Sequence, residues 1–187
     1  MLNIVLFQPE IPPNTGNIIR TCVALNAKLH IIKPISFDLN PIHMARSGAG
    51  RLLSDIQHEV HESYEDFYKK YPKVNIFYLT RYGTKTYSDV DFVASMKQNK
   101  TNDIWLMFGR ESTGIDKNIL FNNLDKCLRI PMFETMRSIY LANCVAILGF
   151  EVLRQLNFDG LSKFEVQKGK NYLKSKVWIE EENKDGK

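Results

Sequence analysis

Residues 128–150 constrain the fold most strongly, because they join an apolar run to a helical pattern through a short loop. The run 128–131 predicts a buried strand that stops at Pro131, since proline cannot donate to a central ladder and biases the residue before it toward extended geometry. Ser138 is then placed to cap a helix. The apolar residues of that helix recur at helical spacing, at Leu141, Cys144, Val145, Leu148 and Val152. The stretch therefore predicts a strand, a loop and a buried helix, as in an ordinary α/β crossover.

The rest of the chain alternates between strand and helix patterns, which predicts an α/β domain with a mostly parallel sheet of about six strands and flanking helices. The run 104–108 is the most hydrophobic and is expected at the centre of the sheet. The expected strands are 3–7, 29–32, 56–60, 74–80, 104–108 and 128–131, and the expected helices are 18–25, 41–53, one after Ser63, one from Asp116 and one after Ser138.

Composition places few limits on function but favours a reducing compartment. The formal net charge of +4 suits an anionic partner and equally suits many enzymes. Cys22, Cys127 and Cys144 are odd in number and widely spaced, which favours reduced core thiols over a disulfide framework. Residues 1–7 form an apolar run of only a strand's length, and no stretch approaches a membrane span. We therefore expect a cytoplasmic protein.

Two further patterns favour neither a metal nor a dinucleotide. The alternation of Ile56, His58 and Val60 predicts a strand, which would place His58 and His61 on opposite faces, so no metal site is predicted. Residues 48–50 are a near miss to the dinucleotide fingerprint, because the third glycine is missing and the segment does not open directly from a strand.

Asn14, Thr15 and Asn17 surround Gly16 ahead of an apolar helical pattern, and Arg20 follows on its first turns. The plain interpretation is a capped helix with a solvated arginine, and this is favoured when the signal is taken alone. The functional interpretation is that the helix N-terminus offers backbone donors to a phosphate while Arg20 adds positive charge.

Residues 109–114 directly follow the most hydrophobic run and hold a charged turn between two glycines. The plain interpretation is a generic strand-to-helix loop. The functional interpretation is that Gly109 lets a ligand approach the backbone and that Glu111 supplies a fixed negative charge. The end of the run 74–80, at Leu79, is another place where an open α/β sheet presents backbone groups to a ligand.

Three stretches, in the same order, match the motifs of one family. They are Asn14-Thr-Gly-Asn-x-x-Arg20, Phe108-Gly-x-Glu-x-x-Gly114, and Arg129-Ile-Pro-Met132 followed by Arg137-Ser138-x-x-Leu141-x-Asn143. Through them residues 1–157 resemble the SPOUT RNA methyltransferases, in particular the small tRNA (cytidine/uridine-34) 2′-O-methyltransferases. The resemblance implies methyl transfer from S-adenosylmethionine to the ribose 2′-hydroxyl of the wobble nucleotide of tRNA. It also implies a homodimer and a deep trefoil knot made by the last strand, loop and helix.

The resemblance further implies which residues form the site. Arg20 matches the catalytic position, and because an arginine is a poor base we expect it to orient a phosphate and to lower the pKa of the 2′-hydroxyl. Asn14 and Glu111 are expected to contact the substrate. The positions that match the family's cofactor site are Leu79, Gly109, Ile130 and Ser138.

Some positions depart from the family pattern. Tyr140 and Ala142 stand where the family has asparagine and a small hydroxyl residue, and residues 49–51 depart although Arg46 and Gly48 match. Two alternatives therefore stay open. One is a non-catalytic RNA-binding module, and the other is a nucleotide-binding oxidoreductase, which the missing glycine fingerprint weakens.

Beyond Asn157 the chain turns polar, and we expect 158–187 to form a solvated tail or surface helix outside a domain of residues 1–157. Alternatively, the lysines of this segment extend an RNA-facing surface through phosphate contacts. These lysines are Lys163, Lys168, Lys170, Lys174 and Lys176.

Overall fold

The computed structural model describes residues 1–39, 53–176 and 178–179. The chain forms two compact units, Met1–Asn157 and Phe158–Lys187. The expected helix at 41–53 lies almost wholly outside the described residues, as do the family positions 46–51. At the end of the expected helix, the structure has a short 3₁₀ helix, η1 (Leu53–Asp55).

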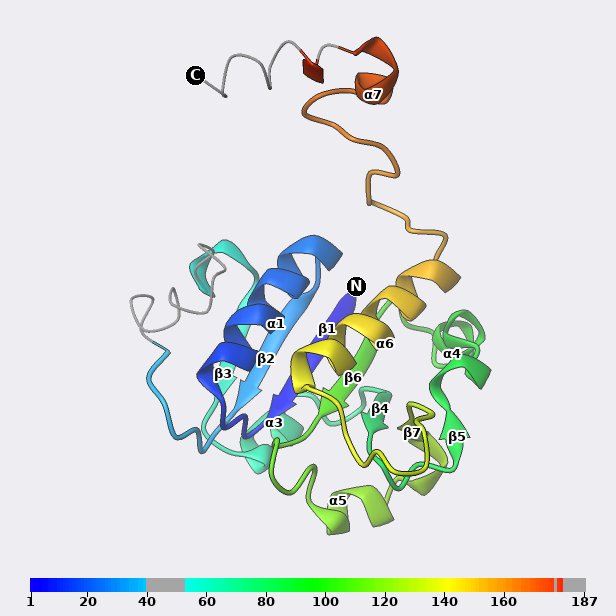
Figure 1. The fold of residues 1–187 in the computed structure, drawn as a ribbon. Helices are drawn as coiled ribbons and strands as arrows, with labels where there is room; N and C mark the ends of the chain where they lie inside the picture. Colours follow the sequence, from blue (N-terminus) through cyan, green and yellow to red (C-terminus); the bar gives the residue numbers. More distant parts are fainter. Residues whose placement is uncertain (40–52, 177, 180–187) are drawn as a thin grey trace. The chain divides into compact units, whose positions relative to one another are not determined.

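One seven-stranded sheet forms the frame of the first unit, in the order β3-β2-β1-β6-β4-β7-β5, and all neighbouring strands are parallel (Figure 1). The predicted α/β class is confirmed, and each expected strand is present. β5 is an additional edge strand of two residues. β6 lies between β1 and β4 with all five residues buried, as its hydrophobicity predicted. The strands are β1 (Leu2–Phe7), β2 (Lys28–Ile32), β3 (His58–His61), β4 (Ile76–Leu79), β5 (Lys85–Thr86), β6 (Ile104–Phe108) and β7 (Cys127–Arg129).

Helices cover both faces of the sheet. α1 and α6 lie side by side on one face (Figure 1), where a Cβ on Gly149 would meet Leu25 Cδ1 at 2.4 Å. α3 and α5 cover the other face, where Phe67 and Leu120 join the core that contains Val5 of β1. The helices are α1 (Pro12–Leu25), α3 (Tyr64–Lys70), α4 (Phe92–Gln98), α5 (Lys117–Phe121), α6 (Leu141–Gln155) and α7 (Tyr172–Ser175), with 3₁₀ turns η2 (Tyr87–Asp89) and η3 (Leu124–Lys126).

Two helix starts differ from the prediction. α1 begins at Pro12, so Asn14 is buried in its first turn and does not cap it. Proline lacks an amide hydrogen, and Pro12 and Pro13 therefore remove two of the donors that a cap would satisfy. Ser138 does not cap α6 either, since that helix begins after Tyr140, whose side chain makes no capping bond.

Two other helix starts are confirmed. The Ser63 hydroxyl accepts from the amide of Asp66 at 3.1 Å, and Asp116 accepts from the amide of Asn118 at 2.7 Å. α4, which no sequence pattern predicted, begins with Asp91 accepting from the amide of Ala94 at 2.7 Å.

The buried thiols and the helices agree with the compositional expectations. Cys22 and Cys127 are buried, Cys144 is half-buried, and all three are free. Burial raises the pKa of the Cys22 thiol to about 12 and that of Cys144 to about 11, so both are protonated near neutral pH. None of the helices in the described ranges combines the length and the apolar character needed to cross a bilayer.

Candidate active site

Three loops meet at the carboxyl edge of the sheet, because β6, β4 and β7 are neighbours and each ends there. Leu79 ends β4 in register with Phe108 and Leu128. Gly109 follows β6 and is buried, whereas Ile130 follows β7 and is half-buried. The structure therefore brings Leu79, Gly109 and Ile130 to adjacent strand ends, which is where an open parallel sheet binds ligands.

The loop 130–140 after β7 contains the fourth predicted cofactor residue. Ser138 is exposed in this loop. Tyr140 ends the loop with its side chain 75% exposed, and its carbonyl accepts from the amides of Asn143 at 3.0 Å and Cys144 at 3.1 Å. The departure from the family at this position thus places a large ring on the surface while the backbone still opens α6.

Two carboxylates fasten the loop before α1 to the loop after β6, and we call this set of bonds the carboxylate clasp. Glu111 accepts from the amide of Glu10 at 2.8 Å, from the amide of Ile11 at 3.3 Å and from Asn14 Nδ2 at 3.0 Å. Glu10 in return accepts from the amide of Ser112 at 2.9 Å and from its hydroxyl at 2.8 Å. The bonds from Ser112 hold the pKa of Glu10 below its usual value.

The clasp joins the two residues that were expected to contact substrate. Asn14 is buried and Glu111 is half-buried, and each uses its side chain to bind the other. Their role toward a substrate stays a prediction, but their position holds two of the family motifs together. Glu10 and Ser112 were missed, because no local pattern links residues that are 102 positions apart.

The physical reason expected for Gly109 is wrong. A Cβ there would lie 2.2 Å from the amide nitrogen of Ile115 and 2.3 Å from the carbonyl carbon of Gly114. The protein's own loop therefore fills the space that was assigned to a ligand. The loop closes on itself through Arg110 and Gly114, whose backbone groups exchange hydrogen bonds of 3.3 and 3.0 Å, with Gly114 at a φ of +76°. The assignment of Gly109 to the cofactor site stays a prediction.

Gly83 was also missed by sequence reasoning. A Cβ on Gly83 would lie 2.5 Å from the carbonyl carbon of Leu128 and 2.9 Å from the amide nitrogen of Arg129. The loop that carries Gly83 therefore lies directly against β7. The Arg129 guanidinium adds a hydrogen bond to the carbonyl of Arg81 in the same loop. A solitary glycine in a turn gives no sign of such a contact.

Arg20, the predicted catalytic residue, is exposed on α1. Its neighbours Ile18 and Ile19 are almost fully buried, so the helix turns Arg20 toward the surface. A guanidinium at the surface can bind a phosphate through two parallel N–H donors.

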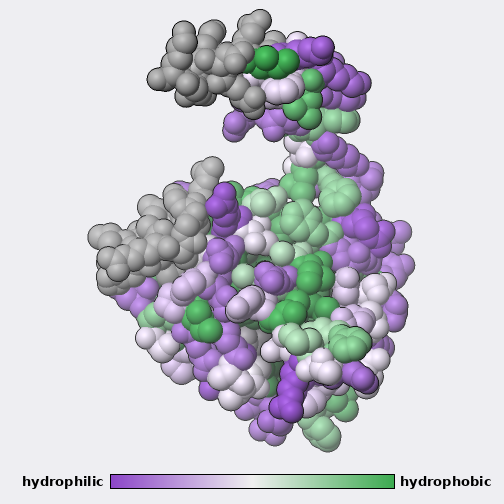
Figure 2. Space-filling model, viewed as in Figure 1, coloured by the Kyte–Doolittle hydropathy of each residue, from purple (hydrophilic) through white to green (hydrophobic). Residues whose placement is uncertain are grey.

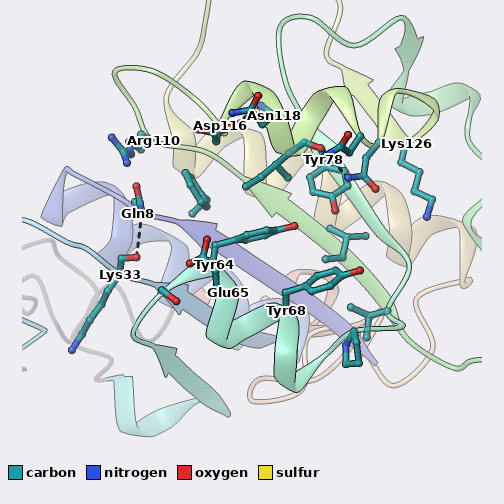
Figure 3. A pocket seen from close by; sticks show the side chains of 18 of the residues that line it. Gln8, Lys33, Tyr64, Glu65, Tyr68, Tyr78, Arg110, Asp116, Asn118 and Lys126 are labelled. Carbon is teal, nitrogen blue, oxygen red and sulfur yellow. Dashed lines mark hydrogen bonds between the residues drawn. The ribbon is translucent and has the colours of Figure 1, made fainter.

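A separate cleft of about 890 Å³ opens between α3 and α5 on the other side of the sheet (Figure 3). Tyr64 and Tyr68 of α3 line it on one side and Arg110 on the other. Gln8 stands at its edge with a φ of 53° and donates from Nε2 to the Lys33 carbonyl at 3.2 Å. The predicted cofactor residues are not among those that line this cleft.

The described residues contain one group with metal-ligating chemistry, His30, Glu59 and His61, whose ligand atoms lie within 4.8 Å of one another. His58 is exposed and His61 buried, as predicted for opposite strand faces. His30 Nδ1 lies 3.2 Å from His61 Nε2, and burial lowers the pKa of both rings, to about 3 for His30. Glu59 accepts from the ammonium groups of two lysines and from a tyrosine hydroxyl. These bonds occupy the carboxylate and place positive charge beside it, which favours a buried hydrogen-bonded network over a cation site.

Comparisons with known proteins agree on one family. The model of the SpoU rRNA Methylase family matches residues 1–150. A candidate tRNA (cytidine(34)-2′-O)-methyltransferase of Geobacillus stearothermophilus is 41% identical over 161 residues, which cover 86% of this chain and 99% of the relative. A solved structure from work on the 2-OH methylation of C/U34 on tRNA is 32% identical to this chain. It superposes with a TM-score of 0.73 and covers 84% of this chain and 91% of the other.

A more distant structure shows the same fold. The rRNA methyltransferase of Sinorhizobium meliloti with bound AdoMet is 24% identical with a TM-score of 0.70, covering 83% of this chain and 56% of the other.

Proposed function

This chain belongs to the SpoU methylase family, and on that basis we propose that it transfers a methyl group from S-adenosylmethionine to the ribose 2′-hydroxyl of nucleotide 34 of tRNA. The observation that carries the proposal is the arrangement of the motifs. The residues that match the family's cofactor site, Leu79, Gly109 and Ile130, lie at three adjacent strand ends. The candidate tRNA methyltransferase of Geobacillus stearothermophilus is similar to this chain over 99% of its own length and 86% of this chain.

The residues at the strand ends fit an adenosyl compound by their chemistry. Leu79 and Ile130 are half-buried apolar side chains at the ends of β4 and β7, where an open parallel sheet offers a site to a ligand. Ser138 adds an exposed hydroxyl from the loop 130–140. When bound, S-adenosylmethionine would supply a methyl group on a cationic sulfonium that needs little further activation.

The protein's own task is then to place the ribose hydroxyl and to favour loss of its proton. We assign this task to Arg20, whose positive charge would bind a neighbouring phosphate and stabilise the developing alkoxide. Asn14 and Glu111 would act from the clasp, by fixing the start of α1 relative to the loop that carries Gly109.

A homodimer is also part of the proposal. Hydrophobic atoms gather over α6 and the loop before it (Figure 2). Tyr140 and Phe150 are 75% and 45% exposed there. Apolar side chains on such a surface mark a protein interface. Sedimentation should show a dimer that Phe150→Glu dissociates, whereas Phe121→Glu, at a 73% exposed position on α5, leaves it intact. A wild-type monomer at micromolar concentration would contradict the dimer.

The trefoil knot is proposed on the basis of the family alone. If the chain ends are pulled apart with optical tweezers, a knot would leave the extended chain shorter than its contour length. An extension equal to the full contour length would rule the knot out.

The experiment that tests the activity is methyl transfer from labelled S-adenosylmethionine to bulk tRNA, followed by nuclease digestion and mass spectrometry to locate the methylated ribose. We expect the label at nucleotide 34, and we expect the activity to reside in the cytoplasm, where tRNA is available. S-adenosylhomocysteine should raise the melting temperature and NAD should not, because only a ligand of the native state stabilises it. Binding of tRNA without any transfer would instead support a non-catalytic RNA-binding module.

A further inference from the structure

The match to the family model ends at residue 150, and the second unit, which follows it, contains a cluster of lysines. Between residues 163 and 176 the only acidic residue is Glu165. The lysines of this stretch are all exposed, and they are Lys163, Lys168, Lys170, Lys174 and Lys176. A local excess of positive charge of this density attracts polyanions.

Aromatic rings lie among these lysines. The Lys170 ammonium is 4.1 Å from the centroid of the Phe164 ring, and the Lys168 ammonium is 4.6 Å from that of Tyr172. Phe164 is 58% exposed. The unit thus presents ammonium groups and aromatic rings on the same surface, a combination that suits a phosphate backbone with unstacked bases.

The unit has no core of its own among its described residues. Val166 and Leu173 are 75% and 77% exposed, and the one named helix, α7, has four residues. A segment that buries so little apolar surface gains most of its order from a partner. A membrane surface is a poor candidate for that partner, because interfacial binding needs a longer amphipathic helix.

We propose that residues 158–176 form an RNA-binding arm that contacts the phosphates and unpaired bases of the tRNA substrate. The lysines neutralise phosphates and release counterions, while Phe164 and Tyr172 stack on bases. The identity of the arm's partner, tRNA, rests on the proposed function. It adds binding energy for tRNA and takes no part in the chemical step.

The test compares two charge-matched variants of the full chain. Lys168→Gln with Lys170→Gln removes two lysines of the arm, and Lys97→Gln with Lys100→Gln removes two exposed lysines near the amino end of β6, away from the candidate site. Fluorescence anisotropy measures tRNA affinity over a series of salt concentrations without S-adenosylmethionine. The arm variant should lower the salt slope by about 1 to 2, because each phosphate contact contributes about 0.7 to 0.9. The control variant should leave the slope unchanged.

Steady-state kinetics of methyl transfer provide a second, independent test of the arm. The arm variant should raise KM for tRNA several-fold with kcat unchanged, since it removes binding that is equal in the ground and transition states. Phe164→Ala should weaken tRNA binding with no change in the salt slope. A wild-type slope and KM in the arm variant, or equal losses in the control variant, would overturn the proposal. Tighter binding to phosphatidylserine vesicles than to tRNA would overturn it too.

Failure of the arm and failure of the methyltransferase assignment give different results. If the wild-type protein methylates no tRNA while the arm variant still loses tRNA affinity, the arm stands and the catalytic proposal falls. If the wild-type protein methylates tRNA and the arm variant keeps its KM, the catalytic proposal stands and the arm falls.

Discussion

Replacement of Gly109 by alanine is expected to distort the loop after β6 and, through it, the cofactor site. The new Cβ would lie 2.2 Å from the amide nitrogen of Ile115, whereas ordinary van der Waals contact begins at 3.4 Å. The three atoms closest to this Cβ all belong to the backbone of Gly114 and Ile115, so no side chain can rotate away. The loop must move by about 1 Å to relieve the contact, since the interior is close-packed.

The cost of that movement follows from what the loop holds. Overpacking of a well-packed site costs about 1–3 kcal/mol. Movement of the loop also strains the two backbone bonds between Arg110 and Gly114 and the clasp bonds made by Glu111. We expect a loss of about 2 kcal/mol in the free energy of unfolding, or about 4–8 °C in melting temperature for a chain of this size. Affinity for S-adenosylhomocysteine should fall at least about tenfold, which corresponds to 1.4 kcal/mol.

Gly114→Ala is the matched control in the same loop. A Cβ at Gly114 has no atom within 4 Å, and only the φ of +76° opposes it. The left-handed backbone costs about 1 kcal/mol for a residue with a Cβ. Urea unfolding and calorimetric titration with S-adenosylhomocysteine should therefore rank Gly109→Ala below Gly114→Ala in both stability and affinity. Wild-type unfolding and affinity in Gly109→Ala, or the reverse ranking, would refute the packing argument.

Three other changes test separate parts of the site and the core. Glu111→Gln should lower the free energy of unfolding by about 1–3 kcal/mol, because an amide cannot accept all the bonds that the carboxylate takes from two backbone amides and Asn14; an unchanged urea midpoint would show that the clasp contributes nothing. Arg20→Ala should keep the affinity for S-adenosylhomocysteine and slow transfer about a hundredfold or more, and loss of both would identify Arg20 as a structural residue. Stability should fall as the pH drops from 6.5 to 5, since the folded-state pKa values of His30 and His61 are lowered and the unfolded chain then binds protons that the folded chain does not. His30 alone should account for about 2 kcal/mol over that interval at 1.4 kcal/mol per unit, and a urea midpoint that is equal at pH 7 and pH 5 would contradict it.

The strands were predictable because a parallel sheet buried on both faces leaves a continuous apolar signal. β1, β2 and β6 each match an apolar run to within one residue. β5 carries no such signal, since Lys85 and Thr86 pair with β7 through their backbone alone. Two residues are too few for a period-2 pattern to be recognised.

The helix starts were less predictable, because several kinds of group can satisfy the first amides of a helix. Asn14 and Ser138 have side chains that commonly cap helices, but neither caps one here. Prolines remove the donors at the start of α1, and α6 opens on the backbone of Tyr140. In both cases the capping propensity of the side chain indicated a helix start close to the observed one. The backbone geometry, however, places the start at a different residue.

The roles of the site residues depend on contacts between distant parts of the chain. Glu111 was identified by its motif, yet its partners Glu10 and Ile11 lie 101 and 100 positions away. The clasp joins the motif that ends in Arg20 to the motif that begins at Phe108. The helix that presents the guanidinium and the loop expected to hold the cofactor are therefore tied by five hydrogen bonds. A substitution on either side of the clasp should consequently alter both the placement of the ribose and the binding of the cofactor, whereas a change at exposed Arg20 should alter only the first.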